Sequence, residues 1–98
     1  MKVNMGTKLQ TLDGKPLIDQ GKPVLLKDAI IAALLSTPQS DKLDAAEKVA
    51  RYELALKCNV QESIDLTIED VAKIKKLVGE LHSILVVGQI SHILEGKQ

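Results

Sequence analysis

Three side chains of this 98-residue chain belong to types that commonly carry out chemistry: Cys58, His82 and His92. A cysteine beside a histidine can act as a nucleophile, and both residue types bind zinc. The two histidines are ten residues apart on one predicted helix, about 15 Å along its axis, so they cannot share an ion within one chain. Cys58 has no local motif and no third orienting residue. We therefore expect no catalytic residue, no metal site and no cofactor, and we interpret Cys58 as a small buried apolar residue.

The basic residues Lys73, Lys75 and Lys76 form the one close group of positive charges in the sequence. Such a group can contact phosphates, which gives one alternative function: a nucleic-acid-associated regulatory protein. Acidic residues on the same predicted helix, including Glu69 and Glu80, cancel much of this charge. No aromatic residue lies nearby to stack on bases. Nucleic acid is therefore not the expected partner.

The last predicted helix, residues 83–95, is apolar around most of its circumference. Gly88 lies in its middle, where glycine costs about 1 kcal/mol relative to alanine. A glycine in such a place is often retained because another backbone passes close by. One side of the helix can pack on its own domain and another on a second copy or a different protein; complete coverage within one chain is the alternative. The residues expected to make these interaction contacts are Ile84, Val87, Gly88, Ile90 and Leu94.

Composition narrows the class of protein further. Apolar residues make up 45% of the chain, which is enough for a globular core, but Tyr52 is the sole aromatic residue. A small aliphatic core of this kind favours self-association, so we expect a homodimer or higher oligomer. Thirteen basic and thirteen acidic residues cancel, whereas proteins that neutralise phosphates usually carry a basic excess.

The sequence also bears on location. A single cysteine allows no internal disulfide, and residues 1–8 lack the apolar core of a signal peptide. The longest apolar run, Ile84–Val87, is far shorter than the roughly 20 residues that span a bilayer. We therefore expect a cytoplasmic protein that does not associate with membranes.

The scaffold that must position these residues is predicted to be α+β and mainly α, within a single domain over residues 1–98. Residues 1–7 are polar and contain glycine, so we expect them to be flexible. Residues 8–26 contain turn signals at Asp13-Gly14 and again near Gly21, which predict a short β-hairpin or meander. Residues 27–98 are predicted to form about four helices.

The first two helices are predicted from apolar spacing. Residues 27–36 are apolar on nearly every side, which is typical of a central, fully buried helix. The second helix runs over residues 41–58, with Ser40 as its N-terminal cap. One apolar stripe runs along this helix at spacings of four, three and four residues, and its members are Ala45, Val49, Tyr52 and Leu56.

The third helix begins with a capping box, in which Thr67 and Asp70 each satisfy the other's backbone, and it ends near Glu80. Its inner stripe is predicted to include Ile74 and Val78. The fourth helix, residues 83–95, ends at Gly96, a residue suited to a helix C-cap.

Several strings, in order along the chain beyond about residue 9, resemble small uncharacterised proteins of tailed bacteriophages and prophages. Leu25 departs from the pattern, because these relatives tend to carry a helix-capping threonine there, so we expect a weakly defined start of the first helix. The strings are Leu12-Asp13-Gly14-Lys15-Pro16, Leu26-Lys27-Asp28-Ala29-Ile30, Ala33-Leu34-Leu35, Glu47-Lys48-Val49-Ala50-Arg51-Tyr52-Glu53-Leu54-Ala55, Asp65-Leu66-Thr67, Glu69-Asp70, Ile74-Lys75-Lys76, Val86-Val87-Gly88-Gln89 and Ile93-Leu94-Glu95-Gly96.

The resemblance implies expression in a bacterial host from a phage or prophage gene cluster, and it carries no functional residues with it. Small phage proteins of this kind commonly act by binding. The expected function is therefore a non-catalytic, self-associating protein–protein interaction module that acts in phage assembly or on a host protein.

Overall fold

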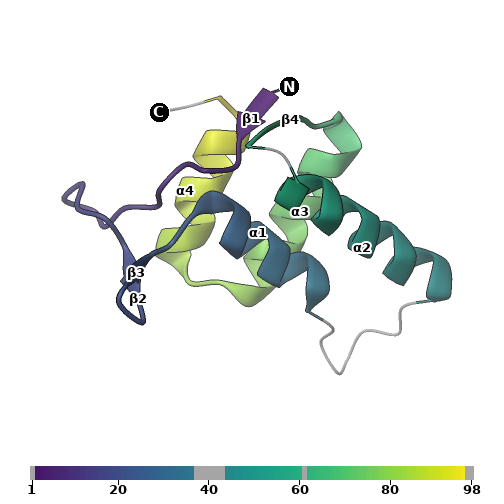
Figure 1. The fold of residues 1–98 in the computed structure, drawn as a ribbon, viewed down its shortest axis with the longest axis horizontal. Helices are drawn as coiled ribbons and strands as arrows, with labels where there is room; N and C mark the ends of the chain where they lie inside the picture. Colours follow the sequence, from purple (N-terminus) through teal and green to yellow (C-terminus); the bar gives the residue numbers. More distant parts are fainter. Residues whose placement is uncertain (1, 37–43, 61, 97–98) are drawn as a thin grey trace.

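The computed structural model describes residues 2–36, 44–60 and 62–96 (Figure 1). Within these ranges the protein is mainly helical with a small amount of β structure, as the sequence predicts. The elements in chain order are β1 (Lys2–Asn4), β2 (Ile18–Asp19), β3 (Lys22–Pro23), α1 (Leu26–Leu35), α2 (Ala45–Val60), β4 (Ser63–Asp65), α3 (Ile68–Leu81) and α4 (Ile84–Leu94).

The N-terminal residues pair with a distant segment, an arrangement that the sequence prediction for residues 1–7 does not include. β1 pairs antiparallel with β4, and Val3 lies opposite Ile64. The Met5 amide donates to the Glu62 carbonyl at 2.6 Å. Val3 and Met5 are buried, because alternate residues of a strand point to the same side. Met1 lies outside the described residues.

The predicted hairpin is present. β2 and β3 pair antiparallel, and the turn between them has positive φ at Gln20 (52°) and Gly21 (78°). Two successive positive φ values define the turn type that best matches the twist of a two-residue hairpin, and glycine favours it. Leu9 extends this β segment, because its amide donates to the Val24 carbonyl and its carbonyl accepts from the Leu17 amide, each at 2.9 Å.

Helix α1 is the central helix, in contact with both α2 and α3 (Figure 1). The sequence predicts that this helix is fully buried, but Ala32 and Leu35 are exposed. Its N-terminus is capped in spite of Leu25, since the Asp28 carboxylate accepts from the Leu25 amide at 3.3 Å. This bond is one half of a capping box; the threonine hydroxyl of the other half is missing, and the Asp28 amide instead donates to the Leu25 carbonyl at 3.1 Å.

Helix α2 begins at Ala45 and ends at Val60, two residues beyond the predicted end. The Asp44 carboxylate accepts from the Glu47 amide at 2.8 Å and so caps the helix. The predicted cap, Ser40, and the predicted first residue, Asp41, lie outside the described residues.

The predicted capping box of α3 is present. The Thr67 hydroxyl accepts from the Asp70 amide at 3.0 Å, and the Asp70 carboxylate accepts from the Thr67 amide at 3.2 Å. Ile74 and Val78 face the core as expected. On α4, the Gln89 side chain accepts from the backbone amide of Gln10 at 2.7 Å and donates to its carbonyl, so it joins this helix to the N-terminal β segment.

One hydrophobic core connects these elements, and it is almost entirely aliphatic. Its members are Val3, Met5, Leu9, Leu26, Ala29, Ile30, Ala33, Leu34, Leu54, Ala55, Cys58, Ile64, Leu66, Ile74, Leu77, Val78, Ile90 and Leu94.

Candidate interaction surface

The apolar stripe that the sequence predicts on α2 faces solvent. Val49, Tyr52 and Leu56 are 54%, 56% and 43% exposed. Ala45, at the start of the same stripe, is exposed as well. The chain therefore presents its one aromatic side chain, flanked by aliphatic neighbours, on the outside of the molecule.

The buried side of α2 lies opposite this stripe. At about 100° per residue, Leu54 and Cys58 lie roughly 200° around the helix from Tyr52 and Leu56. Leu54 and Cys58 are buried. Helix α2 is thus apolar on two opposite sides, and hydrophobic spacing alone does not say which side meets the core.

An open groove borders the stripe where α1 packs against α2. Its volume is about 230 Å³, and it is lined by Ile31, Leu35, Tyr52, Ala55, Leu56 and Asn59. Leu35 is 56% exposed at its rim. We define the α1–α2 face as Ile31, Leu35, Val49, Tyr52 and Leu56. Contiguous apolar surface of this kind commonly marks an interaction site.

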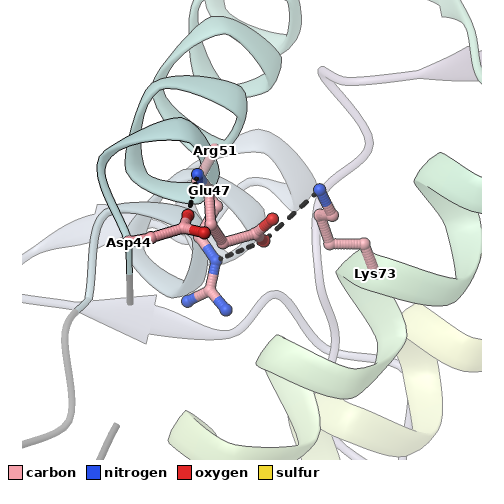
Figure 2. A network of polar contacts seen from close by, with 4 residues as sticks. All are labelled: Asp44, Glu47, Arg51 and Lys73. Atoms are coloured by element: carbon pink, nitrogen blue, oxygen red, sulfur yellow. Dashed lines mark hydrogen bonds and ion pairs between the residues drawn. The ribbon is translucent and has the colours of Figure 1, made fainter. Parts of the chain in front are cut away.

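A network of polar contacts joins α2 to α3 (Figure 2). Arg51 is buried, and its Nε donates to Glu47 Oε1 at 3.1 Å. Lys73 of α3 lies 3.4 Å from the same carboxylate oxygen, so Glu47 bridges the two helices. The hydrogen bond from Arg51, together with the charge of Lys73, lowers the pKa of Glu47. Arg51 Nη1 is buried and has no hydrogen-bond partner among the described residues.

The lysine group on α3 does not form a basic patch. Lys73 pairs with Glu47, and Lys75 Nζ lies 3.5 Å from Glu95 Oε1. Two residues apart on a helix, these lysines point to different sides, one towards α2 and the other towards α4. Only Lys76 of the three is exposed with no ion pair described. This arrangement disfavours the nucleic-acid alternative.

The predicted interaction residues of α4 are divided between the core and the surface. Ile90 and Leu94 are buried in the protein's own core, and Val87 is partly buried against it. Ile84 is 92% exposed. A β-carbon added to Gly88 would meet nothing within 4 Å among the described residues, apart from its chain neighbours and its own helix backbone. The expected close approach of another backbone at Gly88 is therefore wrong within this chain.

Two of the side chains considered for chemistry, Cys58 and His82, have structural roles. Cys58 is buried as predicted, and desolvation raises the pKa of its thiol to about 11, so it remains protonated at neutral pH. A ring nitrogen of His82, Nε2, lies 2.8 Å from the Ala29 carbonyl oxygen, which joins the end of α3 to α1. The described part of the chain holds no group of three or more ligating side chains that could bind a metal ion.

A second open groove of about 410 Å³ lies between the β2–β3 hairpin, α1 and α4, with His82 in its wall. Its lining is mainly aliphatic, with carboxylates at Asp19 and Asp28. The Asp28 carboxylate already serves as the cap of α1.

No described helix is long and apolar enough to cross a membrane.

Comparison of the chain with protein-family models, with curated proteins and with solved structures finds no match. The surface of the protein is therefore the basis for its proposed function.

Proposed function

We propose that this protein is a non-catalytic protein–protein interaction module that binds its partner through the α1–α2 face. The observation that carries the proposal is the exposure of Val49, Tyr52 and Leu56 on the side of α2 opposite the core. Aromatic residues such as tyrosine dominate the energetic centres of protein interfaces. In a chain whose core lacks aromatic residues, the outward position of Tyr52 is better explained by binding than by folding.

The polar network supports the same proposal. Burial of Arg51 leaves one side-chain nitrogen without a hydrogen-bond partner among the described residues, which is costly. Rotation of α2 by half a turn would instead bury Tyr52 and expose the arginine. In the orientation observed, the apolar stripe faces solvent and Glu47 contacts Lys73 of α3. This is the arrangement expected if the stripe has a partner.

The resemblance of the sequence to small phage and prophage proteins suggests where this partner occurs. In the proposal, the protein acts in the cytoplasm of a bacterial host, either during phage assembly or on a host protein. The alternative of a nucleic-acid-associated regulator has no structural observation in its favour, since Lys73 and Lys75 are paired with carboxylates.

A capture experiment with matched variants tests the proposal. Tagged wild-type protein, Tyr52→Lys and Ile84→Lys are incubated with lysates of infected and uninfected bacteria after nuclease treatment, and bound proteins are identified by mass spectrometry. Both substitutions place a lysine at an exposed apolar site, but only Tyr52 lies on the α1–α2 face. We expect wild type and Ile84→Lys to retain the same specific protein and Tyr52→Lys to lose it.

Retention of that protein by Tyr52→Lys would show that another surface is responsible. Recovery dominated by nucleic acid in untreated lysate, with binding that weakens steeply as salt increases, would favour the regulator instead.

A further inference from the structure

We propose that the occupant of the α1–α2 face is a second copy of this chain, with the two α2 helices packed side by side and parallel. This inference rests on the proposed function, because it names the partner for the same face. It is carried by the spacing of the apolar residues, by the charges beside them and by the groove.

The stripe on α2 has the spacing of a helix–helix seam. Ala45, Val49, Tyr52, Leu56 and Asn59 follow one another at intervals of four, three, four and three residues. This is the alternation that lets two helices share one apolar line along their length. The 16 residues of α2 hold about two such repeats.

Two exposed charges flank the seam on opposite edges. Lys48 and Glu53 are five residues apart, so they lie about 140° from each other around the helix, with the stripe between them. In a parallel pair of helices, opposite edges of the two seams meet, and a five-residue offset brings Lys48 of one copy beside Glu53 of the other. The two-fold symmetry makes this contact twice. An antiparallel pair would instead place each edge against itself, with Glu53 towards Glu53.

The residues at the groove also fit a five-residue offset between the two copies. Ala55 forms part of the groove wall on the Lys48 edge, and Val60, five residues later, is exposed on the Glu53 edge. A parallel second copy therefore places its Val60 over Ala55 and beside Leu35, where it fills the groove. Contact between a small and a larger apolar side chain in this way gives close packing at an interface.

The one polar residue of the seam also favours the parallel arrangement. In a parallel dimer each seam residue faces its own copy, so the two Asn59 amides can donate and accept between themselves. A single asparagine in an apolar seam is known to specify register in this way. In an antiparallel dimer the two Asn59 residues would lie towards opposite ends of the seam, where they cannot pair with each other.

Sedimentation velocity over a concentration series tests the inference with purified protein. We expect the wild-type mass to rise from 10.6 kDa towards twice that value as concentration increases. Lys48→Glu and Glu53→Lys should each weaken the dimer by about tenfold or more, because each replaces two attractive contacts by two repulsive ones. The double variant Lys48→Glu/Glu53→Lys should restore the wild-type dissociation constant within about twofold.

Val60→Asp should also weaken the dimer, because it places a charge in the apolar groove, whereas Leu12→Lys, at an exposed apolar site away from α2, should leave it unchanged. Thermal unfolding of every variant confirms that each one folds. A wild-type protein that stays monomeric throughout the series would overturn the inference, and so would a double variant that remains as weak as the single ones.

A monomeric wild type or a weak double variant can be distinguished from failure of the proposed function. If the wild type is monomeric but Tyr52→Lys still loses a protein captured by the wild type, the face binds a different partner, and only the inference of a second copy is wrong.

Discussion

Replacing Arg51 by methionine should stabilise the protein, although it removes an ion pair. Arg51 Nη1 is buried without a partner among the described residues, and such a group costs about 1–3 kcal/mol. The pair between Arg51 and Glu47, at 3.1 Å, involves a carboxylate side chain that is 34% exposed, and a pair of this kind contributes about 1 kcal/mol or less. Methionine keeps the apolar stem of arginine and has no buried donor to satisfy. We therefore expect Arg51→Met to raise the free energy of unfolding by about 1 kcal/mol.

Urea denaturation followed by circular dichroism measures this change, and thermal unfolding should show a rise of about 4–8 °C for each kcal/mol. Arg51→Ala is the matched control, because it removes the charge and the stem together. The cavity that it leaves should make this variant less stable than wild type by about 2 kcal/mol. If Arg51→Met is destabilised by more than about 1 kcal/mol, the guanidinium is worth more than its contacts in the structure indicate, and the argument that its burial is costly is refuted.

Four further predictions concern individual residues. The lowered pKa of Glu47 means that its contribution to stability is present above the unfolded-state pKa and is lost as pH falls through the folded-state pKa; Glu47→Gln should therefore reduce the loss of stability between about pH 5 and pH 3 in urea titrations. Thr67→Ala should cost about 1 kcal/mol in the same assay, because it removes the hydroxyl that accepts from the Asp70 amide, and an unchanged stability would show that this cap is dispensable. Gly88→Ala should stabilise the protein by up to about 1 kcal/mol, since the added β-carbon has open space; a loss of stability would reveal a close neighbour. Cys58 should react with an excess of a thiol reagent only as fast as the protein opens, because the thiol is buried and protonated, so rapid labelling of the native protein would contradict its assignment to the core.

The elements that could be predicted from the sequence depend on residues close together along the chain. The capping box of α3 needs only Thr67 and Asp70, and the β2–β3 turn needs only the glycine at position 21 and its neighbours. Local chemistry of this kind specifies an element wherever it occurs, so the helices and the hairpin could be predicted from the sequence.

The pairing of β1 with β4 could not be predicted in the same way. It joins residue 3 to residue 64, and nothing local to Lys2–Asn4 names its partner. The alternation of Val3 and Met5 as apolar residues was the available sign that this segment is half buried. With two apolar residues it was too short to outweigh the polar composition of residues 1–7.

The side of α2 that meets the core could not be predicted, for a different reason. The helix carries apolar residues on two opposite sides, and the stripe that contains Tyr52 looks more hydrophobic than the side that contains Arg51 and Cys58. In the fold, Leu54, Ala55 and Cys58 are buried, and Glu47 neutralises the buried arginine while it also contacts Lys73.

The same ambiguity bears on function. A helix that serves only its own core needs one apolar side, and a second apolar side exposed to water lowers solubility without stabilising the fold. On α2 the second side is a continuous seam with an asparagine within it and opposite charges along its edges, whereas the exposed Ile84 on α4 stands at the start of its helix and the remaining α4 interaction residues turn mostly towards the core. If the protein acts by binding, the arrangement of α2 accounts for the binding surface, and α4 is explained by packing within the chain.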